Sequence, residues 1–325
     1  MNKNIFSVAL CVLLLAFSVS AEAQQPAKTH RIGLLALGSI TKEGPEAFRE
    51  GLRSLGYVEG QNLIIETRFA EGKPERLAEL VSELIHLKVE IIVSPSTEAI
   101  EMVRRANPSM PVVMAAVSDP IGSGLVASLA KPGGNITGTT QVSTDLAGKR
   151  LELLKEVVPR ITSVALLVQR NHPPTRSLIP EMQRVAEALN ITVQAFEIST
   201  PDEFDGAFTA IKNKRSGAVF IQNNTIFNPN AQRLAELALK KSLPTTGGAR
   251  SFVIAGGLMF YGPDLLSVWG RPAYFVDKIL KGTRPADLPV EQPTKFELVI
   301  NLKTAKILGL TIPQSVLFRA DKVIR

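Results

Sequence analysis

The 325-residue chain contains one cysteine, three histidines and one tryptophan. The cysteine, Cys11, lies in an apolar N-terminal run, so the chain can form no internal disulfide and must draw its stability from a buried core. Its 45% hydrophobic residues can supply such a core. His30, His86 and His172 are far apart and lack the spacing of zinc ligands. We therefore expect no metal and no cofactor.

The signatures of common enzyme sites are also missing. The first apolar strand is followed by LGSITKEG (37–44), which is not the G-x-G-x-x-G of a dinucleotide site. GKR (148–150) has no glycine-rich lead and is no phosphate-binding loop, and GSG (122–124) lacks the spacing of a nucleophile elbow. These absences argue against a nucleotide enzyme and against an exported hydrolase, and we expect the protein not to be an enzyme.

The charge of the chain is positive but not concentrated. Its formal net charge is +7, yet its Lys and Arg residues are spread along the sequence and form no basic cluster interleaved with aromatics. The sequence therefore predicts a solvated surface and no nucleic-acid partner.

The first residues have the pattern of a cleaved export signal. Lys3 precedes an apolar run (5–19) that is shorter than the roughly 20 residues of a membrane-spanning helix. Small residues at Ala21 and Ala23 predict cleavage before Gln24, which makes residues 1–23 a signal peptide. Cys11 follows Leu10, a position unsuited to lipid attachment. The mature chain is expected in the periplasm.

From residue 31 onward, short runs rich in Val, Ile and Leu alternate with longer segments of helical period. The predicted strands of the first half are RIGLLAL (31–37), LIIETRF (63–69), VEIIVS (89–94), PVVMAAV (111–117) and NITGTTQV (135–142). The predicted helices between them are 45–55, 74–87, 97–106 and 121–130. Near-continuous apolar strands alternating with helices indicate a parallel sheet covered on both faces.

The same pattern begins again after residue 142. Its predicted strands are SVALLVQ (163–169), ITVQAFEIS (191–199), GAVFIQ (217–222) and LPTTG (243–247), each followed or preceded by a helical segment. A tail of strand, helix and strand follows, in which Pro272 predicts a break near Arg271. The Pro-rich segment 281–295 is predicted to be an extended connector.

The repeat predicts an α/β fold of two doubly wound parallel-sheet lobes with a ligand cleft between them. We assign residues 30–141 plus 258–287 to the first lobe and residues 142–257 plus 288–325 to the second. The carboxyl ends of both sheets would then face the cleft, which is the usual ligand position in open parallel sheets.

Residues just after the strands are therefore the candidate site. The predicted ligand-binding residues are Gly38, Ser39, Ser96, Thr97, Asp119, Gln141, Asn171, Asn223, Asn224 and Tyr261. Ser96 and Thr97 stand where a strand turns directly into a helix, so their hydroxyls and the first helical N–H groups suit an anion. The alternative is that either residue only caps the helix.

Asp119 has a similar pair of interpretations. It could neutralise a ligand ammonium group, and together with Ser96 and Thr97 it would then hold an amino-acid zwitterion. Because Asp119 precedes Pro120, it could instead open a turn or cap the segment that follows. Tyr261 could form a wall of the pocket by stacking, although scattered aromatics are more often part of a core.

Several long phrases resemble one family. GLRSLGYVEGQNLIIETRFAEG (51–72), VSDPIGSGLVASLAKPGGNITG (117–138), GKRLELLKEVVP (148–159) and PVEQPTKFELVINLKTAKILGLTIP (289–313) are similar to exported substrate-binding proteins of ABC transporters of the tryptophan/tyrosine type. The resemblance covers nearly all of the mature chain. It implies a type I periplasmic binding protein fold, a hinge of three crossings and closure on a small ligand.

The chain also departs from that family's pattern. Asn223 or Asn224 stands where the family carries an aspartate, and Ser251 stands where an acidic residue is usual. These changes weaken an ammonium site in the second lobe, so an aromatic amino acid is one candidate ligand among several.

The function expected from the sequence is that of a periplasmic receptor. It would bind a small polar molecule between its lobes, work as a monomer, and deliver the ligand to the membrane permease of an ABC importer. The alternative is a sensor of the same fold that presents its bound state to a membrane receptor. A cytoplasmic regulator of related fold is excluded by the export signal and by the absence of a DNA-binding headpiece.

Overall fold

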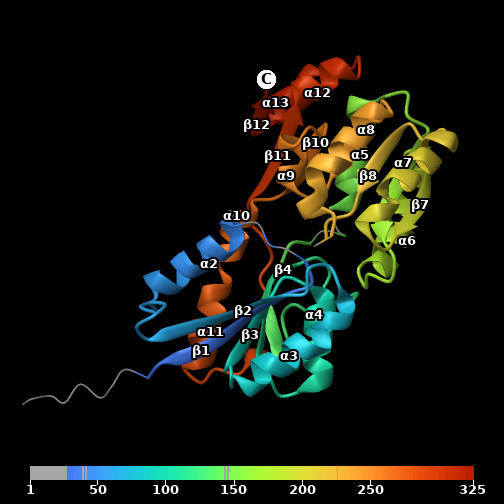
Figure 1. Cartoon of the computed structure of the whole chain (residues 1–325). Coiled ribbons are helices and arrows are strands. Elements are labelled where there is room, and N and C mark those ends of the chain that lie inside the picture. Colours follow the sequence, from blue (N-terminus) through green and yellow to red (C-terminus); the bar gives the residue numbers. More distant parts are fainter. Residues whose placement is uncertain (1–27, 39, 41, 143, 145, 225) are drawn as a thin grey trace, which may run out of the picture.

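The computed structural model describes residues 28–38, 40, 42–142, 144, 146–224 and 226–325. The predicted signal peptide and the site candidate Ser39 lie outside these residues. The described chain folds into two α/β lobes, each built around its own sheet (Figure 1). The predicted fold class is confirmed.

The first lobe contains a five-stranded parallel sheet in the order β2-β1-β3-β4-β5. Its strands are β1 (His30–Ala36), β2 (Leu63–Phe69), β3 (Ile91–Ser94), β4 (Val112–Val117) and β5 (Ile136–Thr140). The helices between them are α2 (Glu43–Ser54), α3 (Leu77–His86) and α4 (Thr97–Ala106). Ile91 to Ser94 and Val112 to Val117 are buried throughout, as expected of strands covered on both faces.

The second lobe contains a seven-stranded sheet in the order β12-β11-β10-β9-β8-β6-β7. Its strands are β6 (Ser163–Gln169), β7 (Thr192–Ile198), β8 (Ala218–Ile221), β9 (Thr245–Gly247), β10 (Met259–Pro263), β11 (Phe296–Asn301) and β12 (Lys322–Ile324). The pairs are parallel except for β10 with β11. The helices are α5 (Ala147–Val157), α6 (Thr175–Ala188), α7 (Phe204–Asn213), α8 (Ala231–Lys240), α9 (Arg250–Ile254), α12 (Leu302–Ile307) and α13 (Gln314–Arg319).

Part of the C-terminal segment returns to the first lobe. Helices α10 (Leu265–Gly270) and α11 (Pro272–Leu280) pack with α2 against one face of the first sheet, and α3 and α4 cover its other face (Figure 1). The two helices are separated at Arg271, as Pro272 predicted, because proline cannot donate the backbone hydrogen bond that would continue the first helix. The first lobe is therefore completed by residues more than a hundred positions away from its strands.

Three local predictions are wrong. Residues 288–291 were assigned to the second lobe, but Leu288 and Val290 pack in the first-lobe core and the N–H of Glu291 donates to the carbonyl of Gly138, so the chain returns to the second lobe after Glu291. Residues 258–263 were placed in the first lobe, but β10 pairs with β9 and β11 in the second sheet, so the chain crosses between lobes near Asp264. Residues 121–130 form turns instead of a helix, since Gly124 adopts a left-handed φ of 68° and the segment is bounded by Pro120 and Pro132.

Candidate functional site

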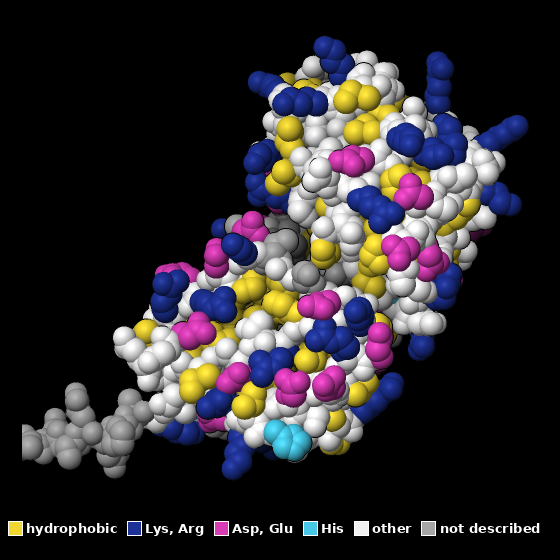
Figure 2. Space-filling model, viewed as in Figure 1, with side chains coloured by type: hydrophobic (Ala, Val, Ile, Leu, Met, Phe, Trp, Pro, Cys, Tyr) yellow, Lys and Arg dark blue, Asp and Glu magenta, His cyan; other side chains and the backbone are white. Residues whose placement is uncertain are grey.

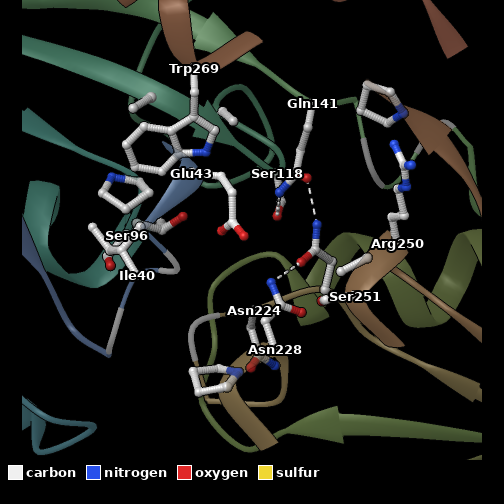
Figure 3. Close-up of a pocket in the computed structure, with 18 of the residues that line it drawn as sticks. Ile40, Glu43, Ser96, Ser118, Gln141, Asn224, Asn228, Arg250, Ser251 and Trp269 are labelled. Atoms are coloured by element: carbon white, nitrogen blue, oxygen red, sulfur yellow. Dashed lines mark hydrogen bonds between the residues drawn. The ribbon is translucent and has the colours of Figure 1, made fainter. Parts of the chain in front are cut away.

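A cavity of about 390 Å³ lies between the two lobes (Figure 3). Its size falls in the roughly 300–1,000 Å³ range of small-molecule sites. Much of its wall consists of residues that follow strands: Ser96 and Thr97 after β3, Ser118 after β4, and Asn223 and Asn224 after β8. The cavity therefore lies at the carboxyl ends of the strands, which is the usual position of ligand sites in open parallel sheets.

Ser96 and Thr97 line the first-lobe wall at the start of α4, and each is only 2% exposed. Ser96 occupies the N-cap position, but its side chain makes no capping hydrogen bond. Its Oγ instead accepts a 2.9 Å hydrogen bond from the N–H of Leu37, at the end of the neighbouring strand. The Ser96 hydroxyl proton is not used in this bond and remains to be donated, and the first N–H groups of α4 are not capped by this side chain.

A chain of side-chain hydrogen bonds runs across the cavity from the second lobe to the first. Asn228 Nδ2 donates to Asn223 Oδ1 (2.6 Å), Asn223 Nδ2 donates to Gln141 Oε1, and Gln141 Nε2 donates to Ser118 Oγ (3.0 Å) (Figure 3). The predicted site residues Gln141 and Asn223 are therefore in contact. Because Ser118 Oγ accepts, its own proton remains to be donated.

Asn224 also lines the cavity but has a structural task as well. Its Oδ1 accepts hydrogen bonds from the N–H groups of Ile226 (2.9 Å) and Phe227 (2.7 Å), which fixes the turn after β8. Its Nδ2 lies 3.5 Å from Gln222 Oε1. Most of its hydrogen-bonding capacity is thus used inside the second lobe.

Asp119, the predicted ammonium partner, does not line the cavity. Its Oδ1 accepts a 2.8 Å hydrogen bond from the N–H of Gly122, and its Oδ2 accepts a hydrogen bond from the hydroxyl of Ser177 on α6. The first contact is the turn-forming role that was the alternative interpretation of Asp-Pro. The second contact joins the two lobes.

Three other predicted residues lie outside the cavity wall as well. Gly38 is buried after β1, and Asn171 adopts a left-handed φ of 58° in the turn after β6. Tyr261 stacks on Phe296 at a centroid distance of 6.2 Å and belongs to the edge of the second-lobe core. The asparagine at 171 shapes the turn that carries the next residue, His172, to the cavity.

Trp269, which was not among the predicted residues, is the largest apolar side chain of the wall. It belongs to α10 and its ring faces the cavity above Glu43 (Figure 3). A Cβ on Gly44 would come within 2.9 Å of two atoms of the indole, so glycine at this position lets α2 pack closely against it. Trp269 is also the single tryptophan of the chain, which makes it a natural fluorescent reporter of the cavity.

Two ion pairs border the cavity. Glu98 Oε1 lies 2.6 Å from His172 Nδ1, and Arg250 NH1 lies 3.2 Å from Glu297 Oε2. Burial opposes ionisation of Glu98, but the His172 charge and hydrogen bond outweigh it and lower its pKa. Burial raises the pKa of Glu297; Arg250 opposes the rise and Asp264 adds to it.

The described residues show neither a cluster of metal ligands nor a membrane-spanning helix. Among the described residues, no group of three or more His, Cys, Asp or Glu is placed to hold a metal ion, and no helix is long and apolar enough to cross a membrane.

Figure 2 shows Lys and Arg side chains scattered over both lobes and interspersed with acidic ones on the face in view. That face shows no concentrated basic surface of the kind that binds nucleic acid.

Residues 41–324 match the family model of ABC transporter substrate binding proteins. The chain belongs to this family. As a substrate-binding protein of the type I periplasmic fold, it carries its ligand cavity where the two lobes meet.

Named relatives and solved structures agree with this assignment. The binding protein is 25% identical over 266 residues to a tyrosine-binding protein of Clostridioides difficile, an alignment that covers 82% of this chain and 76% of the relative. It is 28% identical to an ABC domain of Streptococcus pneumonia solved in complex with L-Trp, with a TM-score of 0.86 and coverage of 91% and 100%. A conserved domain protein of Vibrio cholerae o1 biovar eltor is 26% identical, with a TM-score of 0.87 and the same coverage.

Proposed function

We propose that this protein is the periplasmic binding component of an ABC importer and that it carries an amino acid or a similar small carboxylate to a membrane permease. The cavity between the lobes is the observation that supports this proposal most strongly. Its polar first-lobe wall offers the hydroxyls of Ser96, Thr97 and Ser118 beside the start of α4, which suits a carboxylate.

The wall also offers contacts for the other two parts of an amino acid, its side chain and its ammonium group. Trp269 offers a flat apolar surface, and apolar contact comes from Ile40 and Ala115. The carboxylates of Glu43 and Asp264 supply negative charge for an ammonium group, the role that sequence reasoning assigned to Asp119. The relatives named for tyrosine and solved with L-Trp support an amino-acid ligand for this chain.

No chemical step is needed for this function. Closing the lobes exchanges cavity water for protein contacts, and a permease can then distinguish the closed, loaded protein from the open one. The predicted cleavage before Gln24 would deliver the mature, monomeric protein to the periplasm, where such a permease is met.

A ligand panel tests the proposal. Protein refolded from denaturant to remove any bound ligand would be mixed with amino acids, purines, sugars and small acids while its Tm and Trp269 emission are followed; L-tryptophan would be followed by Tm alone. A ligand at about 100 times its Kd stabilises the native state by about 2.7 kcal/mol. We expect a Tm increase and an emission change from amino acids. Binding restricted to compounds without a carboxylate, or no binding by any compound, would overturn the proposal.

A further inference from the structure

Glu98 and His172 come from opposite lobes. Glu98 lies in the first turn of α4, whereas His172 lies in the turn between β6 and α6, 74 positions later. Their side chains are 17% and 6% exposed, and Glu98 Oε1 lies 2.6 Å from His172 Nδ1. Among the ion pairs of the described residues, this is the one that joins the two lobes.

The turn that carries His172 is well defined. Asn171 takes a left-handed φ of 58°, which asparagine tolerates better than most residues, and this reverses the chain at the end of β6. The N–H of Thr175 then donates to the carbonyl of His172 (2.9 Å), and the Thr175 hydroxyl donates to the carbonyl of Gln169 (3.2 Å). The imidazole is thus held toward the first lobe by local structure of the second.

Two hydrogen bonds accompany the ion pair across the lobes, one to a carboxylate and one between amides. Ser177 donates to Asp119, and Asn223 donates to Gln141. His172 Nε2, in contrast, is buried without a hydrogen-bond partner among the described residues. A buried nitrogen without a partner costs free energy, so closing this contact is favourable only while the Glu98–His172 attraction offsets that cost.

Other charged groups around the pair are fixed in separate contacts or belong to the cavity wall. Arg170 donates to Ser199 and to the carbonyl of Glu197, and Asp119 is bonded to Gly122 and Ser177. The other charged residues of the cavity wall are Glu43, Arg250, Asp264 and Glu297. Within the part of the chain that the structure describes, the His172 side chain is hydrogen-bonded to Glu98.

We propose that Glu98 and His172 form a clasp that holds the lobes closed over the loaded cavity and that releases them in acid. This inference rests on the proposed binding function and adds a regulation to it. In the closed form the pKa of Glu98 is lowered, despite burial, by His172. A carboxyl whose pKa is lowered stabilises the closed form above its ordinary pKa of 4.5 and loses that contribution as the pH falls through the lowered value.

Distances between spin labels on the two lobes can test the clasp. Because Cys11 is the only cysteine, labels can be attached to Ser82→Cys on α3 and Glu187→Cys on α6, two exposed positions. Pulsed electron resonance would measure the ratio of closed to open molecules, with and without saturating L-tryptophan. Glu98→Gln, His172→Gln and the double variant would be compared, and Arg184→Gln, which breaks an exposed ion pair within α6, is the matched control.

We expect either single substitution to lower the closed-to-open ratio about tenfold or more, because it leaves the other buried group without its charged partner. The double variant should lose little more than either single variant, and Arg184→Gln should match the wild type. On acidification below about pH 5, where the contribution of ionised Glu98 is lost, the wild-type ratio should fall more steeply than that of Glu98→Gln. A urea melt of each variant confirms that it is folded.

The clasp would be overturned if all variants had the same closed-to-open ratio, or if the effects of the two single substitutions on that ratio added up in the double variant. It would also be overturned if the ratio responded to pH in the same way in wild type and Glu98→Gln. If L-tryptophan does not bind, we expect the same order of closed-to-open ratios among the ligand-free proteins. A different order in the ligand-free proteins would also overturn the clasp. Ligand binding with unchanged lobe distances in the variants would reject the clasp but leave the proposed function intact. Failure of the whole ligand panel would reject the function itself.

Discussion

Replacing both Ser96 and Thr97 with alanine is expected to lower ligand affinity at least about tenfold. The change removes two hydroxyl donors next to the start of α4, and a hydrogen bond to a charged group contributes about 1.5–3 kcal/mol when the site is desolvated. Calorimetric titration of wild type and variant with the ligand identified in the panel would measure the loss.

The structure also predicts a stability cost for this double variant, and a control separates the two effects. Ser96→Ala would leave the buried N–H of Leu37 without its acceptor, at a cost of about 1–3 kcal/mol. Thr97→Val removes a hydroxyl of the cavity wall at nearly constant volume. If Thr97→Val and the folded double variant bind the ligand as tightly as the wild type, Ser96 and Thr97 have only a structural role.

Gly248→Ala is expected to destabilise the second lobe and to weaken ligand binding together. A Cβ at position 248 would lie 2.2 Å from the Cβ of Asn223 and 2.7 Å from its backbone nitrogen, so the turn after β8 must shift. Overpacking of this kind typically costs about 1–3 kcal/mol. The shift would also disturb the hydrogen bond that the Asn223 side chain donates to Gln141 across the cavity.

Gly206→Ala provides the matched control for this second prediction. Gly206 lies within α7 with nothing within 4 Å of an added Cβ, so alanine should leave affinity unchanged and stabilise the helix by about 0.5–1 kcal/mol. Urea melts and calorimetric titrations of both variants are the measurements. A Gly248→Ala protein with wild-type stability and affinity would show that the contact with Asn223 does not position the cavity wall.

The fold could be predicted because its signals are local. Apolar strands alternating with amphipathic helices specify a wound parallel sheet wherever they occur, and Pro272 marked a helix break that the structure contains. The sheet that a short strand joins is not a local property, so β10 was assigned to the wrong lobe. Similarly, apolar residues in 121–130 suggested a helix, although the flanking prolines and Gly124 favour turns.

The candidate site was predictable to the extent that it follows the strands. The carboxyl-end rule placed Ser96, Thr97, Gln141, Asn223 and Asn224 at the cavity, where they lie. It could not distinguish residues that line a cavity from residues that shape the adjoining turns.

Residues that reach the cavity from elsewhere in the chain carried no such signal. Trp269 is brought there by α10 after the chain has crossed back to the first lobe, and Glu43 comes from the first turn of α2. The neighbouring Gly44 was the available hint for Trp269, because a glycine in a helix often marks a close packing contact.

Small-angle scattering with and without a saturating ligand tests the central claim most directly, namely that the two lobes close on a small molecule held between them. The account predicts a smaller radius of gyration in the loaded protein, since hinged lobes that close around a ligand make the molecule more compact. A radius of gyration that does not change when calorimetry shows the protein to be saturated would contradict closure of the cleft.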